Sequence, residues 1–292
     1  AEADEPPAFG PAPDGSPFER EVRQIFWLTP GHAYEPQTWF CGTSPQGLFR
    51  SDDGGRSWRP VDGLHGHPEF DEWTALESDR TPDGPKLHSV LVDPRSPDSM
   101  IVGMSSAGVL TSDDGGAAWR RLDGGLDGDE SRDPHAIVAA PTNPDRLWMQ
   151  SHFGVYRLDR EQERWTRTGP RGVDGAFDDA GFPIAVHPHD PDVCWVVPMD
   201  GSERWTRTPT GGRPAVMCTR DGGETWERQD AGLPRSDAWW TVKRQCLATD
   251  GYDPLGLYFG TSTGEVWAST NEGARWKCVA RGLPHVYSVE VG

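Results

Sequence analysis

Long apolar runs, basic charge and paired cysteines are all scarce in this chain of 292 residues. The longest apolar run extends only from Val193 to Met199, whereas a membrane-spanning helix needs about 20 apolar residues, so we expect no such helix. Lys and Arg number 28 against 46 Asp and Glu, and the net charge of −18 argues against nucleic acid as a partner. The 5 Cys are scattered and form no Cys-x-x-Cys pair, which argues against a disulfide framework and a structural zinc site.

Turn-forming residues and tryptophan are abundant instead. The chain holds 35 Gly and 27 Pro, more than a globular protein usually has, and its 14 Trp outnumber 10 Phe and 5 Tyr. This composition predicts a folded chain rich in turns, with small buried thiols kept in a reducing compartment. We therefore expect a cytoplasmic location rather than a secreted one.

A pattern of about 12 residues recurs along the chain. It occupies residues 47–58, returns at 108–119 and 215–226, and appears with Asn in place of Asp at 264–276. A degenerate copy at 154–165 keeps the apolar run and the final Trp but has lost the Asp-x-Gly pair. Each full copy reads as a strand followed by a tight turn, because Asp can accept backbone N–H groups and Gly tolerates a positive φ.

A second pattern precedes copies of this 12-residue repeat. It consists of two β-branched runs separated by Asp-Pro or Asn-Pro, as in residues 90–103, and it reads as strand, turn and strand. Four strands in roughly 50 residues, repeated, are typical of the blades of a β-propeller. The sequence thus predicts an all-β fold with a linker at 1–22 and a propeller at 23–292. The predicted blades and closing strand are residues 23–61, 87–122, 136–168, 182–229, 243–279 and 286–291. We expect an N-terminal stretch to be absent and the complete ring to have six or seven blades, with a closed five-bladed ring as the alternative.

The recurring turn resembles the Asp-box, or BNR repeat, of sialidases and related propellers, including an uncharacterised exo-alpha-sialidase or glycosyl hydrolase BNR-repeat branch. The matching residues are Ser51, Asp53, Gly55, Trp58, Ser112, Asp114, Gly116, Trp119, Thr219, Asp221, Gly223, Trp226, Ser269, Asn271, Gly273 and Trp276. The resemblance implies that these residues are structural and lie away from the active face. It does not extend to sialidase activity, because the chain has no Arg-Ile-Pro motif and its few Tyr fall mostly within predicted strands.

Function is expected in the loops at the end of the blades opposite to the Asp-box turns. The residues of these loops fit three alternative kinds of site. Glycoside hydrolysis would use acid–base groups, for which the candidates are Asp83, Asp133, Asp200 and His88. Binding of a small polar ligand, with carbohydrate as the leading class, would use Arg23, Lys86, His135, His152, Trp205, Trp239, Trp240, Lys243 and Arg244. A divalent metal is the alternative use of His88, His135 and His152, since imidazoles are common metal ligands.

Each candidate also has a purely structural interpretation. A His at the start of an inner strand commonly lines the channel, an Asp beside Pro or Gly commonly makes a turn, and a loop Trp, including Trp73 in the long segment 63–86, commonly fills a gap. Non-catalytic relatives of Asp-box proteins include sorting receptors and photosystem II assembly factors, so a protein-binding or assembly propeller is the runner-up function. The residues define no cofactor.

Overall fold

The computed structural model describes residues 3–10, 21–75, 85–105, 107–128, 133–170, 179–201 and 206–291. Two predicted site residues, Asp83 and Trp205, lie outside these ranges. The chain divides into two compact units, Ala1–Pro134 and His135–Gly292. In the part of the chain that is described, no helix is long and apolar enough to cross a membrane.

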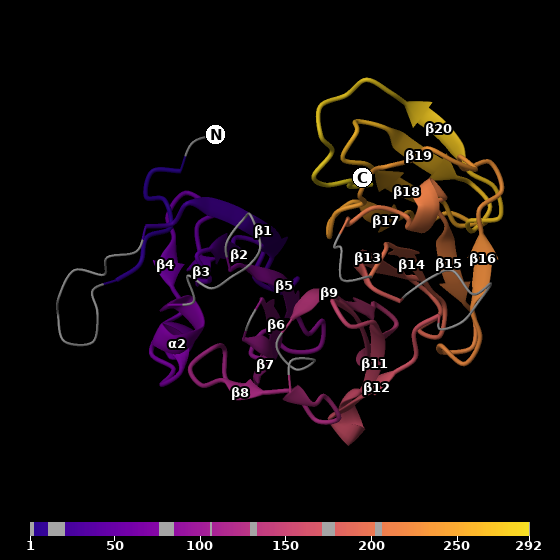
Figure 1. Cartoon of the computed structure of the whole chain (residues 1–292). Helices are drawn as coiled ribbons and strands as arrows, with labels where there is room; N and C mark the ends of the chain where they lie inside the picture. Colours follow the sequence, from indigo (N-terminus) through magenta and orange to yellow (C-terminus); the bar gives the residue numbers. More distant parts are fainter. Residues whose placement is uncertain are drawn as a thin grey trace. The chain divides into compact units, whose positions relative to one another are not determined.

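The first unit holds two four-stranded sheets in which neighbouring strands are antiparallel and follow the order of the chain (Figure 1). Their strands are β1 (Gln24–Pro30), β2 (Trp39–Ser44), β3 (Leu48–Ser51), β4 (Arg59–Pro60), β5 (Leu87–Val92), β6 (Met100–Met104), β7 (Gly108–Ser112) and β8 (Arg120–Arg121). The first strand of the second sheet, β5, contacts β1 and β2 of the sheet before it.

The second unit continues the pattern with three more four-stranded sheets. Their strands are β9 (Pro134–Ala140), β10 (Asn143–Ser151), β11 (Val155–Asp159), β12 (Arg164–Arg167), β13 (Gly181–Val186), β14 (Cys194–Pro198), β15 (Val216–Thr219), β16 (Glu227–Gln229), β17 (Leu247–Thr249), β18 (Leu257–Gly260), β19 (Val266–Ser269) and β20 (Lys277–Ala280). Strand β13 contacts β10 of the preceding sheet and β17 of the following one. Five successive four-stranded antiparallel sheets confirm the predicted all-β fold and its blade pattern.

The strands of a sheet differ in how deeply they are buried. Every residue of β6, β7 and β14 is buried, as expected for strands covered on both faces, whereas β20 alternates between exposed and half-buried residues. Strand β1 differs from β5 and β13, the first strands of their sheets, because its Ile25 and Leu28 are 50% and 57% exposed. Four of the five Cys are buried and all are free, which agrees with the predicted small buried thiols.

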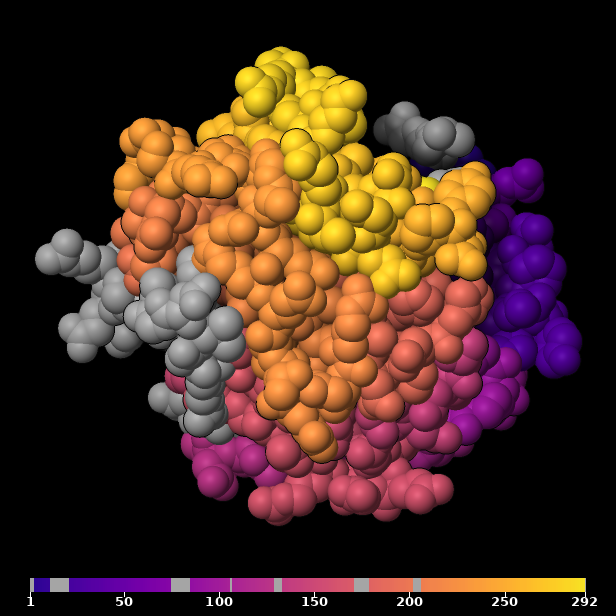
Figure 2. All heavy atoms as spheres, turned by 90° about the vertical axis from the view of Figure 1, so that its right-hand side faces the viewer, coloured from indigo at the N-terminus to yellow at the C-terminus, as the bar shows by residue number. Residues whose placement is uncertain are grey.

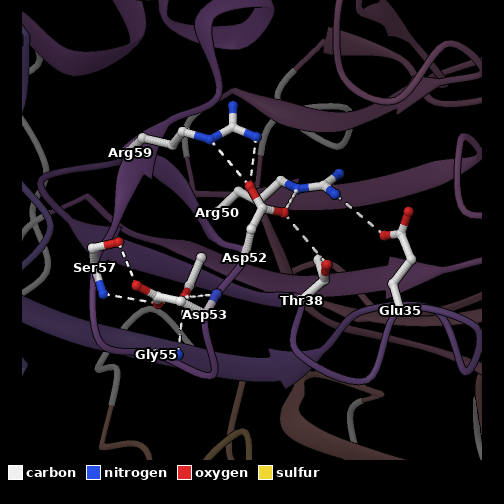
Figure 3. A network of polar contacts seen from close by, with 9 residues as sticks. Glu35, Thr38, Arg50, Asp52, Asp53, Gly55, Ser57 and Arg59 are labelled. Atoms are coloured by element: carbon white, nitrogen blue, oxygen red, sulfur yellow. Dashed lines mark hydrogen bonds and ion pairs between the residues drawn. The ribbon is translucent and has the colours of Figure 1, made fainter.

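The repeated turn joins the third and fourth strands of its sheet through one set of side-chain hydrogen bonds (Figure 3). Ser51 Oγ accepts from the N–H of Gly55 at 2.8 Å and donates to Asp53 Oδ1 at 2.8 Å. Asp53 Oδ1 also accepts the N–H of Ser57 at 2.9 Å, and its Oδ2 accepts the Ser57 hydroxyl at 2.7 Å. These bonds, led by the Ser57 hydroxyl, hold the pKa of Asp53 well below its usual range.

The other copies reproduce this arrangement. The hydroxyls of Ser112, Thr219 and Ser269 donate to Asp114, Asp221 and Asn271 at 2.8, 2.9 and 2.9 Å. The Gly in the fifth position of each turn has φ between 83° and 91°, a conformation that a side chain would strain. The degenerate copy closes its hairpin differently, through the short 3₁₀ helix η2 (Arg160–Gln162) and a left-handed Glu163 with φ of 46°.

Two segments differ from the sequence-based expectations. Within residues 63–86, read as an open loop, the structure has α2 (Phe70–Ala75), preceded by α1 (Asp62–His65). Trp73 of α2 is only 2% exposed and its ring lies 5.4 Å from the Arg121 guanidinium, so it belongs to the core and offers no platform for a sugar. The segment 286–291 forms a single isolated bridge, between Ser288 and Gln245, in place of the expected closing strand.

We predict that Asp221→Ala lowers the melting temperature by several degrees, whereas Asp221→Asn costs less. The Asn oxygen can still accept the Thr225 N–H, which lies 2.9 Å from Asp221, as Asn271 accepts the N–H of Arg275 at 3.0 Å. Hydrogen bonds from Thr225 lower the native pKa of Asp221 from 3.8 to about 2.

This depressed pKa fixes the direction of the pH dependence. The ionised Asp221 stabilises the fold above pH 3.8 and loses that effect as the pH falls through about 2. Thermal denaturation between neutral pH and about pH 2 should therefore show the gap between wild type and Asp221→Ala closing with acid. A gap that stays constant over this range would contradict the assignment.

Candidate functional site

Three basic side chains surround one aromatic ring in the second unit. Phe182 of β13 is 4% exposed, and its ring centroid lies 6.0 Å from the Arg207 guanidinium carbon, 5.5 Å from Lys243 Nζ and 4.9 Å from the Arg244 guanidinium carbon. At such distances the electron-rich ring face attracts each cation. We call Phe182, Arg207, Lys243 and Arg244 the Phe182 cluster.

The topology of the sheet brings these residues together. Phe182 is the second residue of β13, Arg207 belongs to the loop between β14 and β15, and Lys243 and Arg244 precede β17. Because β13 and β14 are antiparallel, the start of one and the end of the other lie at the same end of the sheet. The hydroxyl of Thr241 donates to the Arg207 carbonyl at 2.6 Å and ties the loop to the segment before β17.

A small recess lies beside the Phe182 cluster. It is lined by Phe182, Val197, Pro198, Met199, Arg207, Pro209, Trp240, Thr241 and Val242. Its lining residues are thus mainly apolar, with Arg207 and Thr241 as the polar members. Its free space is about that of one water molecule, so it is a shallow depression and not a pocket that would enclose a ligand.

Two histidines lie next to the cluster. The His135 ring of β9 is 4.7 Å from the Phe182 ring and 5.7 Å from the ring of His152, which follows β10. His135 Nδ1 lies 2.6 Å from the Gly181 carbonyl and must donate to it, so Nε2 of the neutral ring is an acceptor or a metal ligand. With Asp133, directly before β9, these histidines offer three possible ligand atoms within 4.8 Å of one another.

The adjacent tryptophans predicted as ligand platforms differ in their exposure. Trp239 is 57% exposed, whereas Trp240 is 3% exposed, packs 5.7 Å from the Phe259 ring and only lines the recess. Trp239 lies against Gly212, whose N–H donates to the carbonyl of Pro209 at the recess wall. In Figure 2 the orange residues of the second unit lie on the surface that faces the viewer.

Other predicted site residues lie outside this cluster. Lys86 and His88 belong to the first unit and are 1% and 0% exposed; Lys86 Nζ lies 5.4 Å from the Phe26 ring and His88 Nδ1 is 3.1 Å from Ser89 Oγ. Arg23, also in the first unit, is exposed. Asp200 is half-buried in the loop after β14, where its N–H donates to the Thr208 carbonyl at 2.8 Å.

Sequence reasoning identified Lys243 and Arg244 but missed Phe182 and Arg207. Phe182 reads as an ordinary apolar strand residue, and its role depends on three cations from two distant segments. Arg207 falls in the insertion of residues 201–213, where the sequence drew attention to Trp205 instead. The basic character of Arg207 within that insertion was the sequence feature that could have marked it as a site residue.

Comparison with known proteins places the fold. No protein-family model matches the chain. The chain is 24% identical over 272 residues to the oligoxyloglucan-reducing end-specific xyloglucanase of Emericella nidulans, across 81% of this chain and 30% of that protein. Its structure resembles the GH74 xyloglucanase from Xanthomonas campestris with a TM-score of 0.65 and 20% identity, over 91% of this chain and 41% of that one.

An ancestral GH74 enzyme is also similar, with a TM-score of 0.58 and 17% identity over 85% of this chain and 31% of that one. The chain is a β-propeller. It has GH74 xyloglucanase-like homologues at low identity, and it spans less than half the length of each of these three relatives.

The contrast between the two tryptophans gives a stability prediction for the propeller. Trp240→Ala removes a buried ring and should lower the free energy of unfolding by about 3–5 kcal/mol. Trp239→Ala, at an exposed position, should change it by no more than about 0.5 kcal/mol. Urea denaturation of both variants measures the difference, and equal losses would contradict the structural assignment.

Proposed function

We propose that this propeller binds carbohydrate at the Phe182 cluster and its recess, with Trp239 providing an exposed platform beside it. The exposed ring of Trp239, which lies against Gly212 beside the mainly apolar recess, carries the proposal. Sugar rings present apolar faces edged by hydroxyls, so they suit a site with aromatic surface and a few placed polar groups. The relation to proteins named as xyloglucanases supports carbohydrate as the ligand class.

Binding fits the recess better than hydrolysis does. Glycoside hydrolysis commonly uses two carboxylates about 5–9.5 Å apart. The described residues that line the recess include no Asp or Glu. We therefore assign the recess to ligand recognition, and any hydrolytic pair would have to come from other residues.

The repeated turn supports a closer family assignment, which we also propose. Its Ser or Thr, Asp or Asn, and Gly make the same hydrogen bonds in four copies. This is the role that the Asp-box resemblance implies for them. On this proposal the chain is an Asp-box propeller whose turns are structural.

A panel of neutral and acidic oligosaccharides, titrated calorimetrically into the full chain, tests the proposed function. We expect at least one glycan to bind, and Trp239→Ala to weaken it at least tenfold while the melting temperature stays unchanged. Tyr252→Ala is the matched control, because Tyr252 is an aromatic residue 74% exposed in a different loop. Absence of binding across the panel, or equal binding by both variants, would refute the proposal.

A divalent metal is the second candidate ligand, because His135 and His152 lie together beside Asp133. The bond from His135 Nδ1 to the Gly181 carbonyl is the type of contact that orients a metal-binding imidazole. Zn²⁺ or Ni²⁺ added to metal-free protein should then raise the melting temperature, and His152→Gln should remove that rise. His189→Gln, at an exposed position, is the control; a rise that survives His152→Gln would exclude this site.

A further inference from the structure

We propose that Gly212 is a positioning residue, which holds the exposed Trp239 ring in the orientation that a ligand meets. The inference rests on the proposed carbohydrate function, because it assigns a second residue to the same platform. Although Trp239 is 57% exposed, its ring lies close against the backbone of Gly212. A Cβ atom on Gly212 would lie 3.0 Å from Trp239 Cζ2 and 3.1 Å from Cε2. The ring thus occupies the space that a side chain at residue 212 would need.

The conformation of the turn explains why glycine stands at this position. Gly211 and Gly212 have positive φ angles of 62° and 67°, which glycine adopts without strain. They end the short 3₁₀ helix η4 (Thr210–Gly212), where the Gly212 N–H donates to the Pro209 carbonyl at 2.9 Å. Gly212 is buried and Gly211 is exposed, so the two glycines share a backbone shape but differ in their surroundings.

Backbone hydrogen bonds hold the chain on both sides of Trp239. The Ala238 N–H donates to the Gly212 carbonyl at 3.0 Å, so Gly212 fixes the residue before the ring as well as the ring itself. After the ring, the Thr241 N–H donates to Ser262 Oγ at 2.9 Å. Contact with Gly212 then restricts the rotation of the Trp239 side chain. Restriction before binding reduces the entropy lost when a ligand arrives.

The shallow recess makes the orientation of the ring important for affinity. Its free space is about that of one water molecule, so it would not enclose a sugar. A sugar at this surface would be held largely by contact of its apolar face with the Trp239 ring. Such contact is greatest when the two faces are parallel, so a tilt of the ring would weaken binding.

Gly212→Ala and Gly211→Ala test the inference as a matched pair. Both variants add one methyl group at a residue with positive φ, so both strain the backbone to a similar degree. A Cβ at residue 211 would have no described atom within 4 Å, whereas one at residue 212 would press on the Trp239 ring and, at 3.1 Å, on the N atom of Asp237. We expect Gly212→Ala to weaken binding of a glycan from the panel roughly fivefold or more, and Gly211→Ala to leave the affinity close to that of the wild type.

Fluorine NMR of protein labelled with fluorotryptophan reports the ring without any ligand. The Trp239 signal is identified by its loss in Trp239→Phe. It should shift in Gly212→Ala and stay in place in Gly211→Ala. Gly212→Asn is the second variant if Gly212→Ala does not fold, because Asn tolerates a positive φ better and still carries a Cβ atom.

The outcomes separate this inference from the proposed function. An unshifted Trp239 signal in Gly212→Ala, or equal weakening of glycan binding by both glycine variants, would overturn the positioning role and leave carbohydrate binding standing. A signal that shifts only in Gly212→Ala supports the positioning of the ring. If the wild type then binds no glycan of the panel, the proposed carbohydrate function fails, and the assignment of Gly212 to a ligand platform fails with it.

Discussion

This propeller depends on the turn between the third and fourth strands of a sheet, where an Asp or Asn side chain accepts hydrogen bonds and a Ser or Thr hydroxyl both donates and accepts them. In each full copy the Ser or Thr hydroxyl links a Gly N–H to the Asp or Asn side chain, as Thr219 does with Gly223 and Asp221. These bonds satisfy polar backbone groups that a sharp turn would otherwise leave to water. They also fix where each third strand ends, so register is set locally and repeated along the chain.

Within one blade, the structural turn and the Phe182 cluster lie apart. Strand β15 ends at the Asp221 turn and begins at the loop that carries Arg207, so the turn and the Phe182 cluster lie at opposite ends of the same strand. Residues at the end that we propose to bind carbohydrate are therefore under little constraint from the turn. An insertion such as 201–213 can add a guanidinium to the site without changing the hydrogen bonds that close the hairpin.

The sequence was sufficient to predict the repeated parts of the fold but not the assembled site. The blades can be recognised in the sequence because Asp221, Gly223 and their equivalents form turns with residues close to them in the chain. The Phe182 cluster depends on packing between segments about 25 to 60 residues apart, and nothing in the apolar pattern of β13 distinguishes Phe182 from a core residue. The helix that carries Trp73 was not predicted either, because it lies in a segment that interrupts the repeat.

The same reasoning explains why the adjacent Trp239 and Trp240 cannot be assigned from sequence. Both follow the end of one blade, yet Trp240 turns into the core beside Phe259 and Trp239 remains 57% exposed against Gly212. The two side chains thus point to different surroundings, and neighbours in sequence can serve different purposes. The buried ring closes the wall of the recess, and this leaves the exposed ring available beside it. Core packing thus prepares the surface that we assign to the ligand.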